Sequence, residues 1–178
     1  MLCRQSWSRL AQVCGTSNDV RLLSMMIMVL QSHAYMPAPD SSILYHVLLS
    51  PTMVTTTLSG NNPVTVSAQT NYPFGSSITY STTASTSFNL GIRVPGWVSS
   101  EQITYSVDNG VVQTASANSA GYVVVNVLGG SHTVQVNIPM SIKTQSGYNG
   151  AVAVTRGPLT YTLNIDFNST VLANYAVK

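Results

Sequence analysis

The chain has 178 residues, of which 44% are hydrophobic, so it can form one domain with a proper core. Only 7% are charged, against roughly 25% in an average soluble domain, and the net charge is +2. Its seven basic residues are scattered along the sequence. Nucleic-acid binding needs a concentrated basic footprint, and this sequence does not contain one, which excludes that class of protein.

Residues 1–40 differ in composition from everything that follows. They contain both cysteines, Cys3 and Cys14, and the most apolar run of the chain, residues 22–30. The run precedes Ser32-His33-Ala34, which is typical of a signal-peptide core followed by its cleavage site. At nine residues it is too short to span a bilayer, which takes about 20 residues. The alternative is that it is a helix remaining from a preceding domain and packs on the domain that follows.

From Ser41 onward apolar and polar residues alternate with a period of two, which predicts β-strands. Asp108-Asn109-Gly110 predicts a hairpin in which Asn109 and Gly110 both adopt positive φ. We therefore expect an all-β, antiparallel, jelly-roll-like sandwich over residues 41–165, followed by a tail of residues 166–178. The predicted strands are Ile43–Leu49, Met53–Leu58, Val64–Ser67, Ser77–Thr83, Ser87–Val94, Ile103–Val107, Tyr122–Val127, Val134–Ile138, Ala151–Thr155 and Leu159–Ile165.

A series of turn motifs appears in a fixed order along this region. The series is Asn71-Tyr72-Pro73-Phe74, Ile92-Arg93-Val94-Pro95-Gly96-Trp97, Val107-Asp108-Asn109-Gly110, Gly121-Tyr122-Val123, Val136-Asn137-Ile138-Pro139-Met140 and Thr155-Arg156-Gly157-Pro158-Leu159-Thr160-Tyr161. Each motif alone has little specificity, whereas the collinear set is fairly specific. From about Ser41 to Leu163 the chain resembles the β-sandwich that follows the catalytic barrel in β-L-arabinofuranosidases of glycoside hydrolase family 127.

The resemblance implies a non-catalytic role for this part of the enzyme. In that family a helical (α/α)6 barrel upstream supplies a cysteine nucleophile, a glutamate acid/base and a zinc ion held by cysteines and a glutamate. Cys3 and Cys14 are not adjacent, and Glu101 is the only glutamate. We therefore assign no catalytic residue, no metal ligand and no cofactor. We expect a truncated accessory domain that packs beside a helical catalytic barrel encoded elsewhere.

The acidic residues and histidines give no competing catalytic site. Glycoside hydrolysis commonly uses two carboxylates that flank the scissile bond. No motif places two of the five acids on one face; they are Asp19, Asp40, Glu101, Asp108 and Asp166. His46 stands in an apolar run, which favours a partly buried histidine with its hydrogen bonds satisfied, and His132 is expected to face solvent.

The aromatic residues beside two turns are candidates for sugar binding. Trp97, together with Tyr72 and Phe74, is a candidate platform for stacking sugar rings. The alternative is that Trp97 caps the end of the sandwich core. Arg93 and Arg156 adjoin turns that contain proline and are candidates for docking a neighbouring domain. The alternative function is a stand-alone carbohydrate-binding or cell-wall structural module whose partner is a plant or cell-wall polysaccharide.

A single glycosylation sequon is present near the end of the chain. Asn168-Ser169-Thr170 matches the acceptor pattern for N-glycans. Together with the charge-poor, Ser/Thr-rich composition, it indicates a secreted protein.

Overall fold

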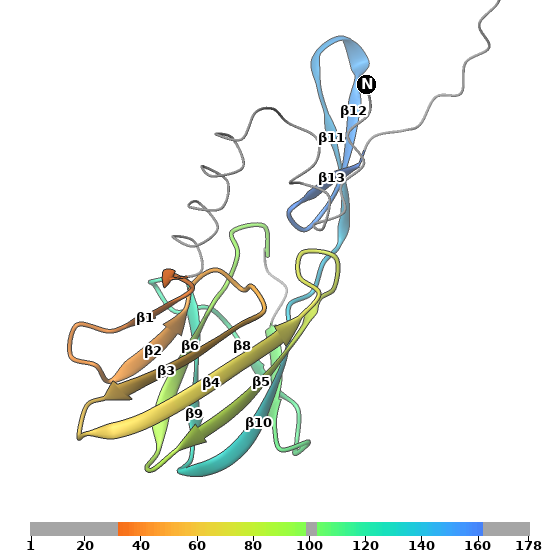
Figure 1. The fold of residues 1–178 in the computed structure, drawn as a ribbon. Coiled ribbons are helices and arrows are strands. Elements are labelled where there is room, and N and C mark those ends of the chain that lie inside the picture. The colour runs from red at the N-terminus through yellow and green to blue at the C-terminus, as the bar shows by residue number, and fades with distance from the viewer. Residues whose placement is uncertain (1–31, 99–102, 162–178) are drawn as a thin grey trace, which may run out of the picture. The chain divides into compact units, whose positions relative to one another are not determined.

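The computed structural model describes residues 32–98 and 103–161 (Figure 1). The chain divides into two compact units, Met1–Met140 and Ser141–Lys178, and each is considered by itself. In the part of the chain that is described, no helix has the length and apolar character needed to cross a membrane.

The first unit consists of two β-sheets (Figure 1). The four-stranded sheet has the order β1 (Tyr35–Pro37), β2 (Ile43–His46), β6 (Phe88–Arg93) and β9 (Tyr122–Val127). The six-stranded sheet has the order β3 (Thr52–Leu58), β4 (Asn62–Thr70), β5 (Ser77–Ala84), β10 (Gly130–Asn137), β7 (Ile103–Val107) and β8 (Gln113–Ala115). Neighbouring strands are antiparallel except β2 and β6, which run parallel. The prediction of an all-β sandwich is confirmed.

The core of this unit lies between the inner faces of the two sheets. Along β4 the residues Val64, Val66 and Ala68 are buried, while Pro63 and Gln69 are exposed, as a half-buried strand requires. Strands of both sheets follow the same alternation, and burying each Val, Leu or Ile stabilises the fold by about 1.5–3 kcal/mol. The largest fully buried side chains include Tyr80, Leu44, Ile78, Leu90, Ile92, Ile103 and Ile138.

The first predicted strand is shorter than the apolar run that suggested it. We expected residues 43–49 to be extended, but β2 ends at His46. Leu49 adopts a φ of 37°, which is incompatible with a β-strand, so residues 47–49 form a loop.

The hairpin after β7 differs by one residue from the prediction. Positive φ occurs at Asp108 (51°) and Asn109 (56°), rather than at Asn109 and Gly110. The N–H of Gly110 donates to the carbonyl of Val107 at 2.8 Å and closes the turn. The Asp108 side chain explains the shift, because its carboxylate accepts the backbone N–H of Thr133 on β10 at 2.8 Å.

The second unit is a three-stranded antiparallel sheet. Its strands are β11 (Ile142–Ser146), β12 (Val152–Arg156) and β13 (Leu159–Tyr161), with the 3₁₀ turn η2 (Tyr148–Gly150) between the first two. The sequence predicted β12 and β13 but not β11, nor the short strands β1 and β8 of the first unit. The predicted domain end at residue 165 and the tail 166–178 lie outside the described residues, so these boundaries stay predictions.

Candidate functional site

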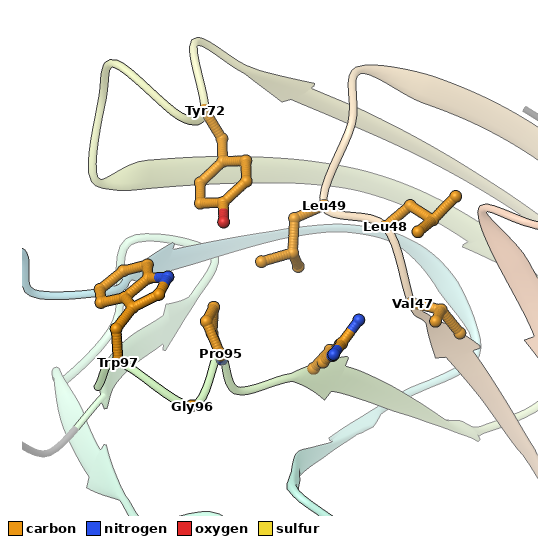
Figure 2. Close-up of a pocket in the computed structure, with 8 residues that line it drawn as sticks. Val47, Leu48, Leu49, Tyr72, Pro95, Gly96 and Trp97 are labelled. Atoms are coloured by element: carbon orange, nitrogen blue, oxygen red, sulfur yellow. The ribbon is translucent and has the colours of Figure 1, made fainter. Parts of the chain in front are cut away.

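A hollow of about 320 Å³ opens at one end of the sandwich (Figure 2). Its lining consists of apolar and aromatic side chains with a single charged one, that of Arg93. The lining residues are Val47, Leu48, Leu49, Tyr72, Arg93, Pro95, Gly96 and Trp97. We call this feature the end hollow. It combines the predicted sugar-binding residues Tyr72 and Trp97 with one of the predicted docking residues.

Three loops build the end hollow, and each connects two strands. Residues 47–49 lie between β2 and β3, Tyr72 lies between β4 and β5, and residues 95–97 lie between β6 and β7. In the second loop the carbonyl of Asn71 accepts the N–H groups of Phe74 and Gly75. In the third the N–H of Val98 donates to the carbonyl of Pro95 at 3.0 Å. These backbone bonds hold both aromatic residues on closed turns.

Tyr72 and Trp97 hold each other in place. Figure 2 shows the Tyr72 hydroxyl and the indole nitrogen of Trp97 both pointing toward the space between the lining side chains. Burial raises the pKa of Tyr72, while a hydrogen bond with the Trp97 indole and the positive charge of Arg93 oppose that rise. Indole N–H groups only donate, so the Tyr72 oxygen is the acceptor. Both rings are half-buried and pack against the core, so Trp97 caps the core and lines the hollow at once.

The other predicted site residues lie elsewhere. Phe74 is 56% exposed and does not line the end hollow, so it forms no part of the predicted sugar platform with Tyr72 and Trp97. Arg156 is the last residue of β12 in the second unit and is half-buried. Asn168 and Glu101 fall outside the described residues.

A second polar cluster is buried inside the core. From the sequence we expected His46 to be partly buried with its hydrogen bonds satisfied, but the side chain lies between the sheets, is fully buried, and leaves Nε2 without a hydrogen-bond partner among the described residues. His46 on β2 is fully buried, and its Nδ1 is hydrogen-bonded to the hydroxyl of Tyr80 on β5 at 2.8 Å, which ties one sheet to the other. The ring of Tyr35 stacks on His46 with 4.4 Å between ring centroids. Burial lowers the pKa of His46 to about 4, so the imidazole is neutral at pH 7. The cluster is part of the packed interior and faces no cleft.

His132 is paired with the hairpin carboxylate instead of facing solvent alone. Its Nδ1 lies 2.6 Å from Oδ2 of Asp108, and its Nε2 lies 3.2 Å from the carbonyl oxygen of Gly129. The hydrogen bond that the imidazole donates to Asp108, together with the Gly129 carbonyl, raises the pKa of His132. The hydrogen bonds from His132 and Thr133 lower the pKa of Asp108. The pair ties the β7–β8 hairpin to β10, which is a structural role.

The described residues do not fit a zinc ion. Within residues 32–98 and 103–161, no three His, Cys, Asp or Glu side chains lie together as a metal site requires. Cys3, Cys14 and Glu101 fall outside these ranges. The expectation that the chain carries no cofactor therefore stays a prediction.

The carboxylates that are described serve local structure. Asp40 accepts the backbone N–H of Ser42 at 3.0 Å and its hydroxyl at 2.7 Å, forming a tight Asx turn. Asp108 holds the hairpin as set out above. Fold and site together define an all-β sandwich domain with an apolar, aromatic-walled hollow at one end.

The comparisons with known proteins agree with this class. Residues 43–140 match the sequence model of the family described as "Beta-L-arabinofuranosidase, GH127 middle domain", and the chain belongs to this family. No curated protein matches the chain.

Solved structures show the same fold. One is a family 127 β-L-arabinofuranosidase from Geobacillus stearothermophilus T6, with 21% identity and a TM-score of 0.62 over 80% of this chain and 22% of that one. A second family 127 β-arabinofuranosidase has 19% identity and a TM-score of 0.55, covering 72% of this chain and 23% of that one. A third structure, of a glycoside hydrolase, has 21% identity and a TM-score of 0.60, and the match covers 90% of this chain and 27% of that one. The chain thus spans between 22% and 27% of the length of these proteins.

Proposed function

We propose that this chain is the accessory β-sandwich domain of a glycoside hydrolase of the β-L-arabinofuranosidase type, and that it catalyses no hydrolysis by itself. The match to the middle-domain family over residues 43–140 carries the proposal. The contacts of Asp40 and Asp108 support it, because each carboxylate is engaged in holding a turn. Glycosidases need carboxylates or equivalent groups free to reach the scissile bond.

In this proposal the sandwich packs beside a catalytic barrel supplied by the same or a separate polypeptide. The solved relatives support this, because the chain corresponds to 22–27% of each of them. Any zinc belongs to the barrel, so we expect the purified chain to contain no stoichiometric zinc by atomic emission.

Sequencing the transcript that encodes this chain, together with the rest of the genome, tests the proposed partner. We expect a coding region for a helical barrel, either joined to this sequence or on its own. A genome in which no such barrel is encoded would contradict the accessory role.

We also propose that the protein is exported. The sequon at Asn168 and the charge-poor, Ser/Thr-rich composition support this. Expressed in a eukaryotic secretory host, the chain is expected in the medium with one N-glycan, and Asn168→Gln is expected to remove the glycan-dependent mobility shift. Retention inside the cell would contradict export.

A further inference from the structure

The end hollow is a built feature that the accessory role does not explain. Its volume of about 320 Å³ lies at the lower end of the 300–1,000 Å³ typical of small-molecule sites. Like those sites it is mostly apolar, with a few polar groups that converge on it: the Tyr72 hydroxyl, the Trp97 indole N–H and the Arg93 guanidinium. A space of this size accommodates one sugar ring.

One residue in the wall of the end hollow has a strained backbone. Leu49 has a φ of 37° although it is a bulky residue and not a glycine, and its side chain is only 3% exposed. A non-glycine residue held at positive φ costs about 1–3 kcal/mol, and such strain clusters at ligand-binding sites. Here it turns the chain after Leu48 so that both leucine side chains line the hollow (Figure 2).

The aromatic walls are fixed before any ligand arrives. Both rings are half-buried and pack against the core, which restrains both side chains. A ligand therefore loses little affinity to the ordering of these rings. The flat, C–H-lined face of a sugar ring is a suitable partner for such walls, because its hydroxyl groups remain at the solvent edge.

The charge of Arg93 specifies the second part of the ligand. Arg93 is exposed at the end of β6, where its side chain lines the hollow and its positive charge acts on Tyr72. The described carboxylates, those of Asp40 and Asp108, are engaged with Ser42 and with His132 and Thr133. A guanidinium group binds a planar carboxylate through two parallel hydrogen bonds, which makes a carboxylate its preferred partner.

We propose that the end hollow binds a sugar that carries a carboxylate, a uronic acid residue of a polysaccharide, with its ring against Tyr72 and Trp97 and its carboxylate on Arg93. The proposal rests on the shape of the hollow and on the charge of Arg93, so it stands or falls independently of the accessory role.

Titration with trigalacturonate tests the proposal. The readout is the NMR signal of the Trp97 indole N–H in the full-length chain carrying Trp7→Phe, which leaves a single indole. We expect trigalacturonate to shift this signal and Arg93→Gln to weaken binding about tenfold or more, since hydrogen bonds to charged groups are worth that factor. Lys143→Gln, which removes a cation from the second unit, is the matched control and is expected to change nothing.

Three results would overturn the assignment of a uronic acid to the end hollow. The first is that trigalacturonate leaves the Trp97 signal unmoved at several millimolar. The second is that neutral galactotriose binds as well as trigalacturonate, which would remove the role of Arg93. The third is that a triglutamate peptide binds equally well, because the hollow would then recognise a protein carboxylate and not a sugar.

Discussion

His46 makes the fold sensitive to acid, and the size of the effect follows from its burial. The imidazole is fully buried between the sheets, with Tyr80 bonded to Nδ1 and Tyr35 stacked on its face. Its pKa is lowered from 6.5 to about 4 in the folded chain, chiefly by burial. The unfolded chain therefore binds a proton at a higher pH than the folded chain does.

The sign and magnitude of the effect follow from this difference. Stability rises with pH wherever the unfolded state binds more protons, so His46 destabilises the fold as pH falls from about 6.5 to about 4. A pKa difference of one unit between the folded and unfolded chain changes the free energy of unfolding by about 1.4 kcal/mol, so the whole shift of His46 changes it by roughly 3 kcal/mol. Tyr35 and Tyr80, the titratable groups that face the imidazole, stay protonated because burial raises the pKa of both.

Urea unfolding followed by fluorescence at pH 7, 6, 5 and 4.5 measures the effect. We expect the free energy of unfolding of the wild type to fall by most of this roughly 3 kcal/mol between pH 7 and pH 4.5. The variant His46→Gln retains a hydrogen-bonding side chain but does not titrate, so its stability is expected to change much less over the same range. Asp108 does not mask the effect, because its lowered pKa makes its contribution disappear only at still lower pH.

Two outcomes would refute this reasoning. The first is an equal loss of stability with falling pH in the wild type and in His46→Gln. The second is a histidine titration by NMR in which the His46 signal moves near pH 6.5. Either would mean that the imidazole reaches water in the folded chain.

Two further substitutions test the packing and the surface pair. Gly91→Ala on β6 is expected to lower the free energy of unfolding by about 1–3 kcal/mol, because the new Cβ would overlap the Tyr45 ring of the parallel neighbour β2. Urea unfolding measures the effect. Gly96→Ala is the control, because its new Cβ meets nothing within 4 Å. Asp108→Asn is expected to bring the pKa of His132 down toward its usual value, measured by NMR titration. The stabilisation linked to protonated His132 is complete below pH 6.5 and disappears as pH rises through its raised pKa. In Asp108→Asn the free energy of unfolding should therefore change less with pH over that range.

Each of these two substitutions has one outcome that would contradict its prediction. A Gly91→Ala variant as stable as Gly96→Ala would show that the Tyr45 ring moves aside without cost. An unchanged His132 titration in Asp108→Asn would show that the carboxylate does not set the protonation of the imidazole.

Local sequence patterns predicted the strands that alternate regularly and missed those that do not. β4 alternates Val64, Val66 and Ala68 with polar residues and was predicted. β11 contains a single apolar residue, Ile142, and has no alternation, so it forms through pairing with β12 and was not predicted. The parallel pairing of β2 with β6 joins segments about 45 residues apart, and no local period encodes such a partner.

The candidate site was predictable in some of its residues but not in its arrangement. Aromatic residues next to turns suggested Tyr72 and Trp97, and the structure brings both to the end hollow. Arg93 was assigned to docking because it adjoins a turn that contains proline, and no local pattern indicated that its side chain lines the same hollow as these rings. The positive φ of Leu49 was not foreseeable, because leucine disfavours that conformation and only the surrounding packing enforces it.

Hydrolysis of p-nitrophenyl β-L-arabinofuranoside by the purified full-length chain tests the central claim most directly. We expect no turnover above that of a mock purification, with or without added zinc. Turnover that copurifies with the chain and is abolished by Glu101→Gln, Asp40→Asn or Asp108→Asn would contradict the account, because it would place a reacting group within a domain that we propose to be non-catalytic.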